Sequence, residues 1–269
     1  LLCQNDSKND IDLVIHSGVC RDSLEPATAN IVHYNLSLSP HAVAFDCSNA
    51  CVGFLNAISM AASMIELKQI RRALIVTGEN SGPIYKSTID KLNKELCPFS
   101  FRLSLANLTL GSAAAAVILA HNSESTSKHR ILSGLGQTDS KSHNLCRGDG
   151  NIHNLTMKTD TKQLMEKGLA LSHVSWELFK RKLDWTNTTP KHFITHQISK
   201  IHHKKVFSLL GIDPQKGYSF IEELGNTGSA AAPLSLILAA EQNAFKPGDL
   251  IALLGIGSGL STLMLGFQW

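Results

Sequence analysis

The stretch AFDCSNACVGF, residues 44–54, passes from a short apolar run into four polar residues and then into small residues. Its first residues predict a buried strand, and residues 49–69 carry apolar side chains at helical spacing. Ser48 and Asn49 are the candidate N-caps, which would put Cys51 just inside that helix. Because unpaired N–H groups and the helix dipole favour an anion there, we expect a lowered pKa for Cys51 and a reactive thiolate. The alternative is a buried cysteine that only fills space.

Length and composition are those of an ordinary globular protein. With 269 residues, 43% of them hydrophobic and 17% charged, the chain can bury a large core in one large or two closely packed domains. The longest purely apolar stretch, 113–120, is far shorter than the roughly 20 residues of a membrane span, so we expect a cytoplasmic protein. A net charge of +3 does not indicate a nucleic-acid partner. The six scattered cysteines suit neither a disulfide scaffold nor a zinc site, so we expect no metal.

Strand and helix patterns alternate along the chain, which predicts an α/β protein with largely buried sheets. Short apolar runs predict strands at 11–18, 42–46, 73–79, 110–120, 129–137, 192–197, 218–226 and 249–255. Residues 162–183 have the pattern of a long helix, and another helical run follows His196 and ends at Gly211. The segment 139–154, rich in Gly, His, Asn and Asp, predicts an exposed loop that covers a site or is disordered.

The second half of the chain repeats the first. Three pairs of segments correspond: LVIHSG (13–18) with HFITHQ (192–197), HAVAFDCSN (41–49) with YSFIEELGN (218–226), and ALIVTGE (73–79) with DLIALLG (249–255). An offset of 175 residues aligns Cys51 with Asn226, so these two lie at equivalent turns. We divide the chain into an N-terminal half, 1–125, and a C-terminal half, 126–269. The first half begins at what we interpret as a helix tail, so we expect that an N-terminal strand and most of a helix are missing.

Three candidate functional residues follow predicted strands. Cys51 comes after the second strand, His196 ends the strand HFIT, and Asn226 lies in the segment ELGNTGSAAAP. Taken singly, His196 is as consistent with a structural histidine and Asn226 with a turn residue. In open α/β sheets, however, ligands bind outside the carboxyl ends of strands, where all three are expected.

Other features leave alternatives open. The glycines of GIGSGLS (255–261) do not suit a dinucleotide loop, because only ten residues follow Gly259; a hairpin turn fits, with an N–H near Ser258 available to an oxyanion. Glu25 precedes a proline at the start of a predicted helix, where an acidic residue also suits the helix dipole. Lys200 and Lys204 belong to a basic cluster that is either a solvated helix face or a docking surface for an anionic carrier or nucleotide.

The segments CSNACVGFLNAI, THQISKIH and ELGNTGSAAAPLSL resemble the active-site cysteine, histidine and asparagine motifs of the ketoacyl synthase III branch of the thiolase superfamily. Their order fits too, with 145 residues from Cys51 to His196 and 30 more to Asn226. The likeness covers essentially the whole chain, although Ala113 stands where that family usually has a glycine. CRDSLEPATA is similar to a segment of the long-chain acyl-CoA condensing enzymes of bacterial olefin biosynthesis, whose glutamate reaches into the partner subunit's site.

This resemblance implies a duplicated thiolase fold of five αβαβα layers, with two mixed five-stranded sheets, in a homodimer. It implies catalytic roles for Cys51, His196 and Asn226, an oxyanion site at the backbone of Cys51 and Ser258, and a base role for Glu25 in the partner subunit. No cofactor is implied beyond a CoA or phosphopantetheine thioester as substrate.

The implied reaction is a Claisen condensation of two long-chain acyl-CoA molecules through an S-acyl cysteine, giving a 2-alkyl-3-oxoacyl product. One alternative is condensation of acyl-CoA with malonyl-acyl carrier protein, which starts fatty-acid synthesis and needs no strong base. Two more are a noncatalytic acyl-binding subunit and a thioesterase-like enzyme in which water takes the acyl group. Chain length, branching and the choice of carrier are not readable from the sequence.

Overall fold

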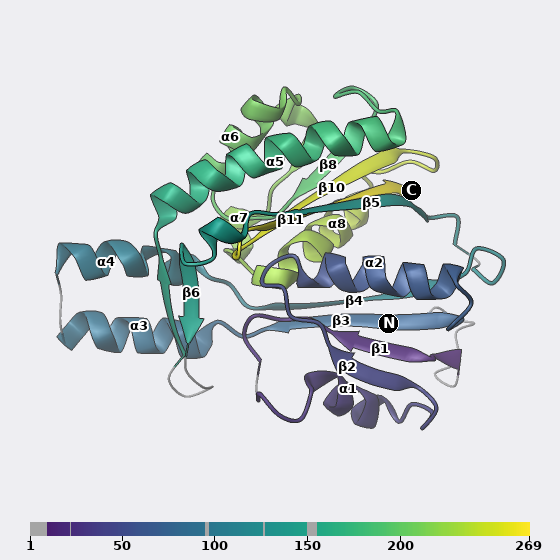
Figure 1. The fold of residues 1–269 in the computed structure, drawn as a ribbon, viewed down its shortest axis with the longest axis horizontal. Helices are drawn as coiled ribbons and strands as arrows, with labels where there is room; N and C mark the ends of the chain where they lie inside the picture. The colour runs from purple at the N-terminus through teal and green to yellow at the C-terminus, as the bar shows by residue number, and fades with distance from the viewer. Residues whose placement is uncertain (1–9, 22, 95–96, 126, 150–154) are drawn as a thin grey trace.

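The structure, a computed structural model, describes residues 10–21, 23–94, 97–125, 127–149 and 155–269. Two β-sheets alternate with helices in the order helices, sheet, helices, sheet, helices (Figure 1). The expected five-layer arrangement is therefore confirmed.

Among the described residues the first sheet has four strands, not the expected five, in the order β2-β1-β3-β4. Its strands are β1 (Leu13–His16), β2 (Val43–Asp46), β3 (Arg72–Glu79) and β4 (Ala113–Ala120). The first three are parallel, and β4 runs antiparallel to β3. Helix α1 (Thr28–Leu36) lies on its outer face and α2 (Gly53–Glu66) on its inner face (Figure 1).

The second sheet has the order β5-β11-β10-β8-β9. Its strands are β5 (Arg130–Thr138), β8 (His192–Thr195), β9 (Gly217–Tyr218), β10 (Leu250–Gly257) and β11 (Ser261–Gln268). β8 lies parallel to β9 and β10, just as β1 lies parallel to β2 and β3, and β11 runs antiparallel to β10 as β4 does to β3. The repeat inferred from the sequence is thus visible in the topology. Helices α5 (Thr161–Leu183) and α6 (Lys200–Leu210) cover the outer face, and α8 (Ala231–Glu241) packs on the inner face.

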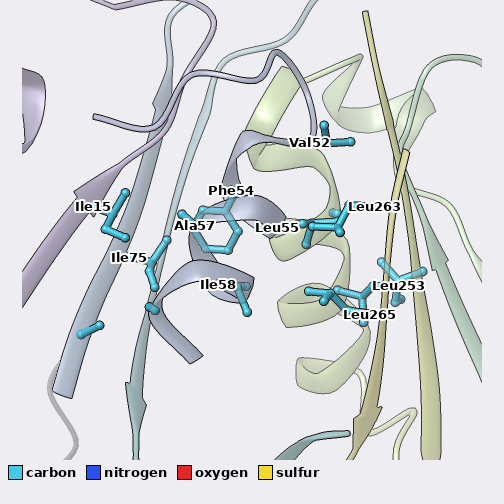
Figure 2. Packing of buried hydrophobic residues seen from close by; sticks show 14 of the residues in the cluster. Ile15, Val52, Phe54, Leu55, Ala57, Ile58, Ile75, Leu253, Leu263 and Leu265 are labelled. Atoms are coloured by element: carbon cyan, nitrogen blue, oxygen red, sulfur yellow. The ribbon is translucent and has the colours of Figure 1, made fainter. Parts of the chain in front are cut away.

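Helix α2 forms the centre of the core because both of its faces are apolar. Figure 2 shows Phe54 turned toward Ile75 of the first sheet and Leu55 turned toward Leu263 of the second. All four side chains are at least 96% buried. A helix with apolar residues nearly all round is stable only when it is enclosed, so α2 needs both sheets.

Two expectations were wrong in part. Cys146–Asp149 within the predicted loop forms strand β6, which pairs with β7 (Thr156–Thr159); residues 150–154 lie outside the described residues. The predicted strand at 218–226 shortens to β9, because the chain turns into helix α7 (Ile221–Leu224) before Asn226. The expected N-terminal helix tail falls on residues 1–8, which are also outside the description.

The remaining elements are short or peripheral. They are α3 (Gly82–Lys94), α4 (Pro98–Ser104) and the 3-10 turns η2 (Leu105–Thr109), η3 (Ser140–Ser142), η4 (Pro214–Lys216) and η5 (Gly228–Ala230). Among the helices in the described ranges, none combines the length and apolar character that crossing a membrane requires.

A buried hydrogen bond joins the two halves at the start of α2. The Phe54 N–H donates to Ser229 Oγ at 3.1 Å, and Ser229 Oγ also lies 3.2 Å from Ser17 Oγ. The helix has no side-chain cap at its own N-cap position, Val52. Ser229 therefore satisfies an N–H group that a helix start otherwise leaves without a partner.

Replacing Ser229 by Ala should lower the free energy of unfolding by about 1–3 kcal/mol, because the buried Phe54 N–H loses its acceptor. Urea denaturation measures the change. Ser63→Ala is the matched control: this serine is exposed on the same helix, so a change within about 0.5 kcal/mol is expected. Equal effects of the two variants would show that the bond between the halves contributes nothing.

Candidate active site

Cys51 lies in a tight turn just before α2, not inside the helix as expected. Val52 N–H donates to the Asn49 carbonyl at 3.1 Å, and Gly53 N–H donates to the Ala50 carbonyl at 3.2 Å. Ala50 has a φ of 45°, a left-handed conformation that residues other than glycine adopt rarely. Helix α2 begins only at Gly53, and Asn49 Nδ2 donates to Asn56 Oδ1 at 2.8 Å. The expected capping by Ser48 or Asn49 is therefore wrong.

The pKa of the Cys51 thiol is raised, not lowered as predicted. Burial is the main cause, and the negative charge of Glu79 is the next. Although Cys51 keeps part of its surface exposed, protein surrounds the thiol. The loss of hydration raises the thiol pKa more than the nearby start of α2 lowers it, so the resting group is a neutral thiol.

Glu79 is a buried carboxylate that the sequence reasoning missed. It ends β3 with 6% of its surface exposed and accepts three backbone N–H bonds of 2.9 Å, from Val19, Cys20 and Ser229. Burial raises its own pKa against the effect of these bonds, and burial together with Glu79 raises the pKa of Cys20 to about 12. A charged residue at the end of the apolar run ALIVTGE was the available signal.

Asn226 is held by the first half of the chain. Its N–H donates to the Thr109 carbonyl at 2.9 Å, and its carbonyl accepts from Gly111 N–H at 2.8 Å. The side-chain Oδ1 accepts from Gly228 N–H at 3.0 Å, so Nδ2 is the group that can donate to a substrate oxygen. Glu79 lies against the same turn: a Cβ on Gly228 would come 2.7 Å from Glu79 Oε1.

His196 follows β8, and its N–H donates to the Leu254 carbonyl of β10 at 3.0 Å. Its side chain is only 4% exposed. Burial, with a smaller effect of His202, lowers the pKa of His196 to about 3. The imidazole is therefore neutral at physiological pH and offers one N–H donor and one acceptor.

The predicted hairpin is confirmed, with residues 258–260 joining β10 to β11. Its turn adjoins Cys51, because a Cβ on Gly257 would lie only 3.2 Å from the backbone nitrogens of Cys51 and Val52. Ser258 thus directly follows Gly257, the residue that contacts the cysteine turn.

Glu25 is exposed, in the segment before α1. That helix begins at Thr28, so the proline after Glu25 lies outside its first turn, contrary to expectation. The first N–H groups of α1 are bound instead by Asp46, which accepts from Thr28 at 3.0 Å and from Ala29 at 2.9 Å. The polar residue Asp46 thereby anchors the segment that carries Glu25.

Lys200 and Lys204 both lie exposed on α6. Lys200 forms an ion pair of 2.8 Å with Glu222, which raises its pKa. This contact favours a solvated face for Lys200. Within the described part of the chain, no group of three or more His, Cys, Asp or Glu is arranged to hold a metal ion.

The structure gathers these segments around the start of α2. The Asn226 turn reaches it through Ser229, and the hairpin turn reaches it through Gly257. His196 is hydrogen-bonded to β10, whose Gly255 lies against α2: a Cβ there would be 2.6 Å from Leu55 Cδ1. A thiol, an imidazole and a carboxamide thus come from segments that adjoin one another between the two sheets.

Two family models match the chain. Residues 45–140 match 3-oxoacyl-[acyl-carrier-protein] synthase III, and residues 181–269 match the C-terminal part of the same family. An acyl-CoA:acyl-CoA alkyltransferase from Xanthomonas campestris is 37% identical over 96% of this chain and 76% of its own length. One from Shewanella oneidensis is 36% identical over 97% of this chain and 77% of its own length. A crystal structure of X. campestris OleA with bound lauric acid and lauroyl-CoA matches with a TM-score of 0.94 and 37% identity, covering 98% of this chain and 78% of that one.

The raised pKa of Cys51 predicts slow alkylation by iodoacetamide at pH 7, with a rate that still increases above pH 9 because the thiolate forms only at high pH. Peptide mass spectrometry measures this rate against that of the exposed Cys97 in the same sample. Glu79→Gln should accelerate Cys51 at pH 8, since removing a nearby negative charge lowers the thiol pKa. Faster labelling of Cys51 than of Cys97 at pH 7, with a plateau below pH 8, would refute the neutral thiol.

Proposed function

We propose that this protein condenses two long-chain acyl-CoA molecules, on the premise that the chain belongs to the 3-oxoacyl-[acyl-carrier-protein] synthase III family of acyltransferases. The supporting observation is the 37% identity to an acyl-CoA:acyl-CoA alkyltransferase over 96% of the chain. The ketoacyl synthase III of Aliarcobacter butzleri is 32% identical over 95% of it. The product is a 2-alkyl-3-oxoacyl thioester.

In the first half-reaction, Cys51 attacks the carbonyl carbon of an acyl-CoA. A bond forms between Cys51 Sγ and that carbon, the bond to the CoA sulfur breaks, and the thiol proton passes to CoA. Because the thiol is protonated at rest, the proton must leave as the sulfur attacks. In this proposal the backbone N–H groups of Cys51 and Ser258 stabilise the tetrahedral oxyanion.

In the second half-reaction, a second acyl-CoA loses an α-proton and its carbanion attacks the acyl-cysteine. The new carbon–carbon bond releases Cys51 Sγ. His196 Nε2–H and Asn226 Nδ2 donate to the enolate oxygen, where charge develops in the transition state. A neutral imidazole suits this role, because its N–H donates a hydrogen bond to the enolate oxygen while the ring itself carries no charge.

The α-proton needs a base, and Glu25 from the partner subunit of a homodimer is our candidate. Its exposure allows it to reach another chain, and the Asp46 bonds to α1 give its segment a defined position. We place the homodimer in the cytoplasm, with Lys204 available to the phosphates of CoA.

The second candidate function is condensation of acyl-CoA with malonyl-acyl carrier protein. It is favoured by the similarity to the A. butzleri synthase, which is named for a carrier-protein reaction. Here loss of carbon dioxide supplies the carbanion, so Glu25 would be dispensable.

Glu25→Gln tests the proposal on the full-length protein. We expect acyl-CoA condensation to fall by about 100-fold or more, because a general base contributes 10²–10⁴. The S-acyl adduct on Cys51, seen by intact-protein mass spectrometry, should still form. Glu66→Gln, an exposed acid at the end of α2, is the control with unchanged rates.

Four results would contradict the proposal. Unchanged acyl-CoA condensation in Glu25→Gln would show that Glu25 is not the base. Turnover with malonyl-acyl carrier protein alone would favour the second candidate. No mass gain would indicate a noncatalytic acyl-binding subunit, and a transient gain with free fatty acid would indicate hydrolysis.

A further inference from the structure

A second histidine is buried behind His196. His202 lies on α6, and only 4% of its surface is exposed, the same fraction as for His196. His196 and His202 line one small cavity, together with Ser172 of α5 and the backbone of Gly255. The reaction described above gives His202 no role.

The two imidazoles share an unmet hydrogen-bonding requirement. The Nδ1 atoms of His196 and His202 are both buried, and neither has a hydrogen-bond partner among the described residues. Buried polar groups in native proteins almost always have a partner, which is often an ordered water. The remaining cavity wall includes Thr195, whose Oγ1 lies 3.3 Å from His203 Nδ1, and is otherwise apolar: Val206, Leu210, Leu254, Ile256 and Met264.

The cavity has the size for one water molecule. Its volume is about 10 Å³, close to the lower limit for a single buried water. Such a water normally makes about three hydrogen bonds, and the residues lining the cavity offer the two unpartnered Nδ1 atoms and Ser172 Oγ as candidate partners. A larger polar ligand does not fit.

We propose that His202 is a positioning residue for His196, which it holds through one water molecule bound between the two Nδ1 atoms. In this chain of bonds His202 Nδ1–H donates to the water, and the water donates to His196 Nδ1. His196 Nδ1 is then an acceptor, so the imidazole proton resides on Nε2, where it can be donated to a substrate oxygen. The role of Nε2–H as donor rests on the proposed function.

The electrostatics of the pair agree with this arrangement. Burial lowers the pKa of His202 to about 4, with a further contribution from His203, and His202 in turn helps to lower the pKa of His196. Both rings are therefore neutral above about pH 5, and a neutral ring has the single N–H that a directed chain of hydrogen bonds needs.

His202→Leu tests the proposal, because leucine fills space but offers the water no partner. We expect kcat for condensation to fall about 10- to 100-fold, the range typical of removing a group that orients a metal-bound histidine, with KM within about twofold. His202→Gln, which retains a polar group, should restore part of the loss. His173→Leu is the matched control: this histidine is exposed on α5 and does not line the cavity, so the same substitution there should leave kcat nearly unchanged.

Nitrogen-15 NMR of His196 gives a readout that is independent of the reaction. The Nε2–H tautomer should predominate in the unaltered protein and in His173→Leu, and a mixture of tautomers should appear in His202→Leu. Stoichiometric S-acylation of Cys51 corrects kcat for misfolded protein. Unchanged tautomers in His202→Leu, or a kcat loss fully explained by misfolding, would overturn the proposal. If the protein does not condense acyl-CoA, the NMR result still decides whether His202 positions His196.

Discussion

The arrangement of this site depends on one constraint: the two halves meet at equivalent positions. Phe54 and Ser229, joined by the buried hydrogen bond, are 175 residues apart, which is also the spacing of Cys51 and Asn226. Cys51 and Asn226 lie three residues before Phe54 and Ser229, respectively. The contact between Phe54 and Ser229 therefore brings the turns that carry Cys51 and Asn226 together at the start of α2.

The same closeness determines the electrostatics. The interior that brings the turns together also removes water from them, so the pKa of Cys51 is raised and that of His196 is lowered to about 3. The candidate site consists at rest of neutral donors and acceptors, with the buried Glu79 behind them. Such groups stabilise the charge that forms on a substrate during the reaction, and they carry no charge of their own before it.

Sequence patterns predicted most strands, the long helix α5 and the repeat, because these depend on apolar spacing within a segment. They failed where a partner comes from far along the chain. Ser229 takes the place of a local cap on α2, and Asp46 binds the start of α1, so neither helix end was predicted correctly. The pKa of Cys51 was predicted in the wrong direction for the same reason, since burial and Glu79 are tertiary effects. The sequence did not point to His202, because the pattern of a helix does not distinguish an exposed histidine from a buried one.

Strand β10 sets the alignment of the whole arrangement. Gly255 comes close to α2 and Gly257 to the cysteine turn, whereas the side chains of Leu254 and Ile256 line the cavity beside His196 on the opposite face. Since neighbouring residues of a strand point to opposite faces, sliding β10 by one place along β8 would turn Ile256 toward the cysteine turn, where a Cβ already has little room. A wrong register of β10 along β8 would thus keep Cys51 from its position in the turn. The cysteine turn can form only when this register is correct.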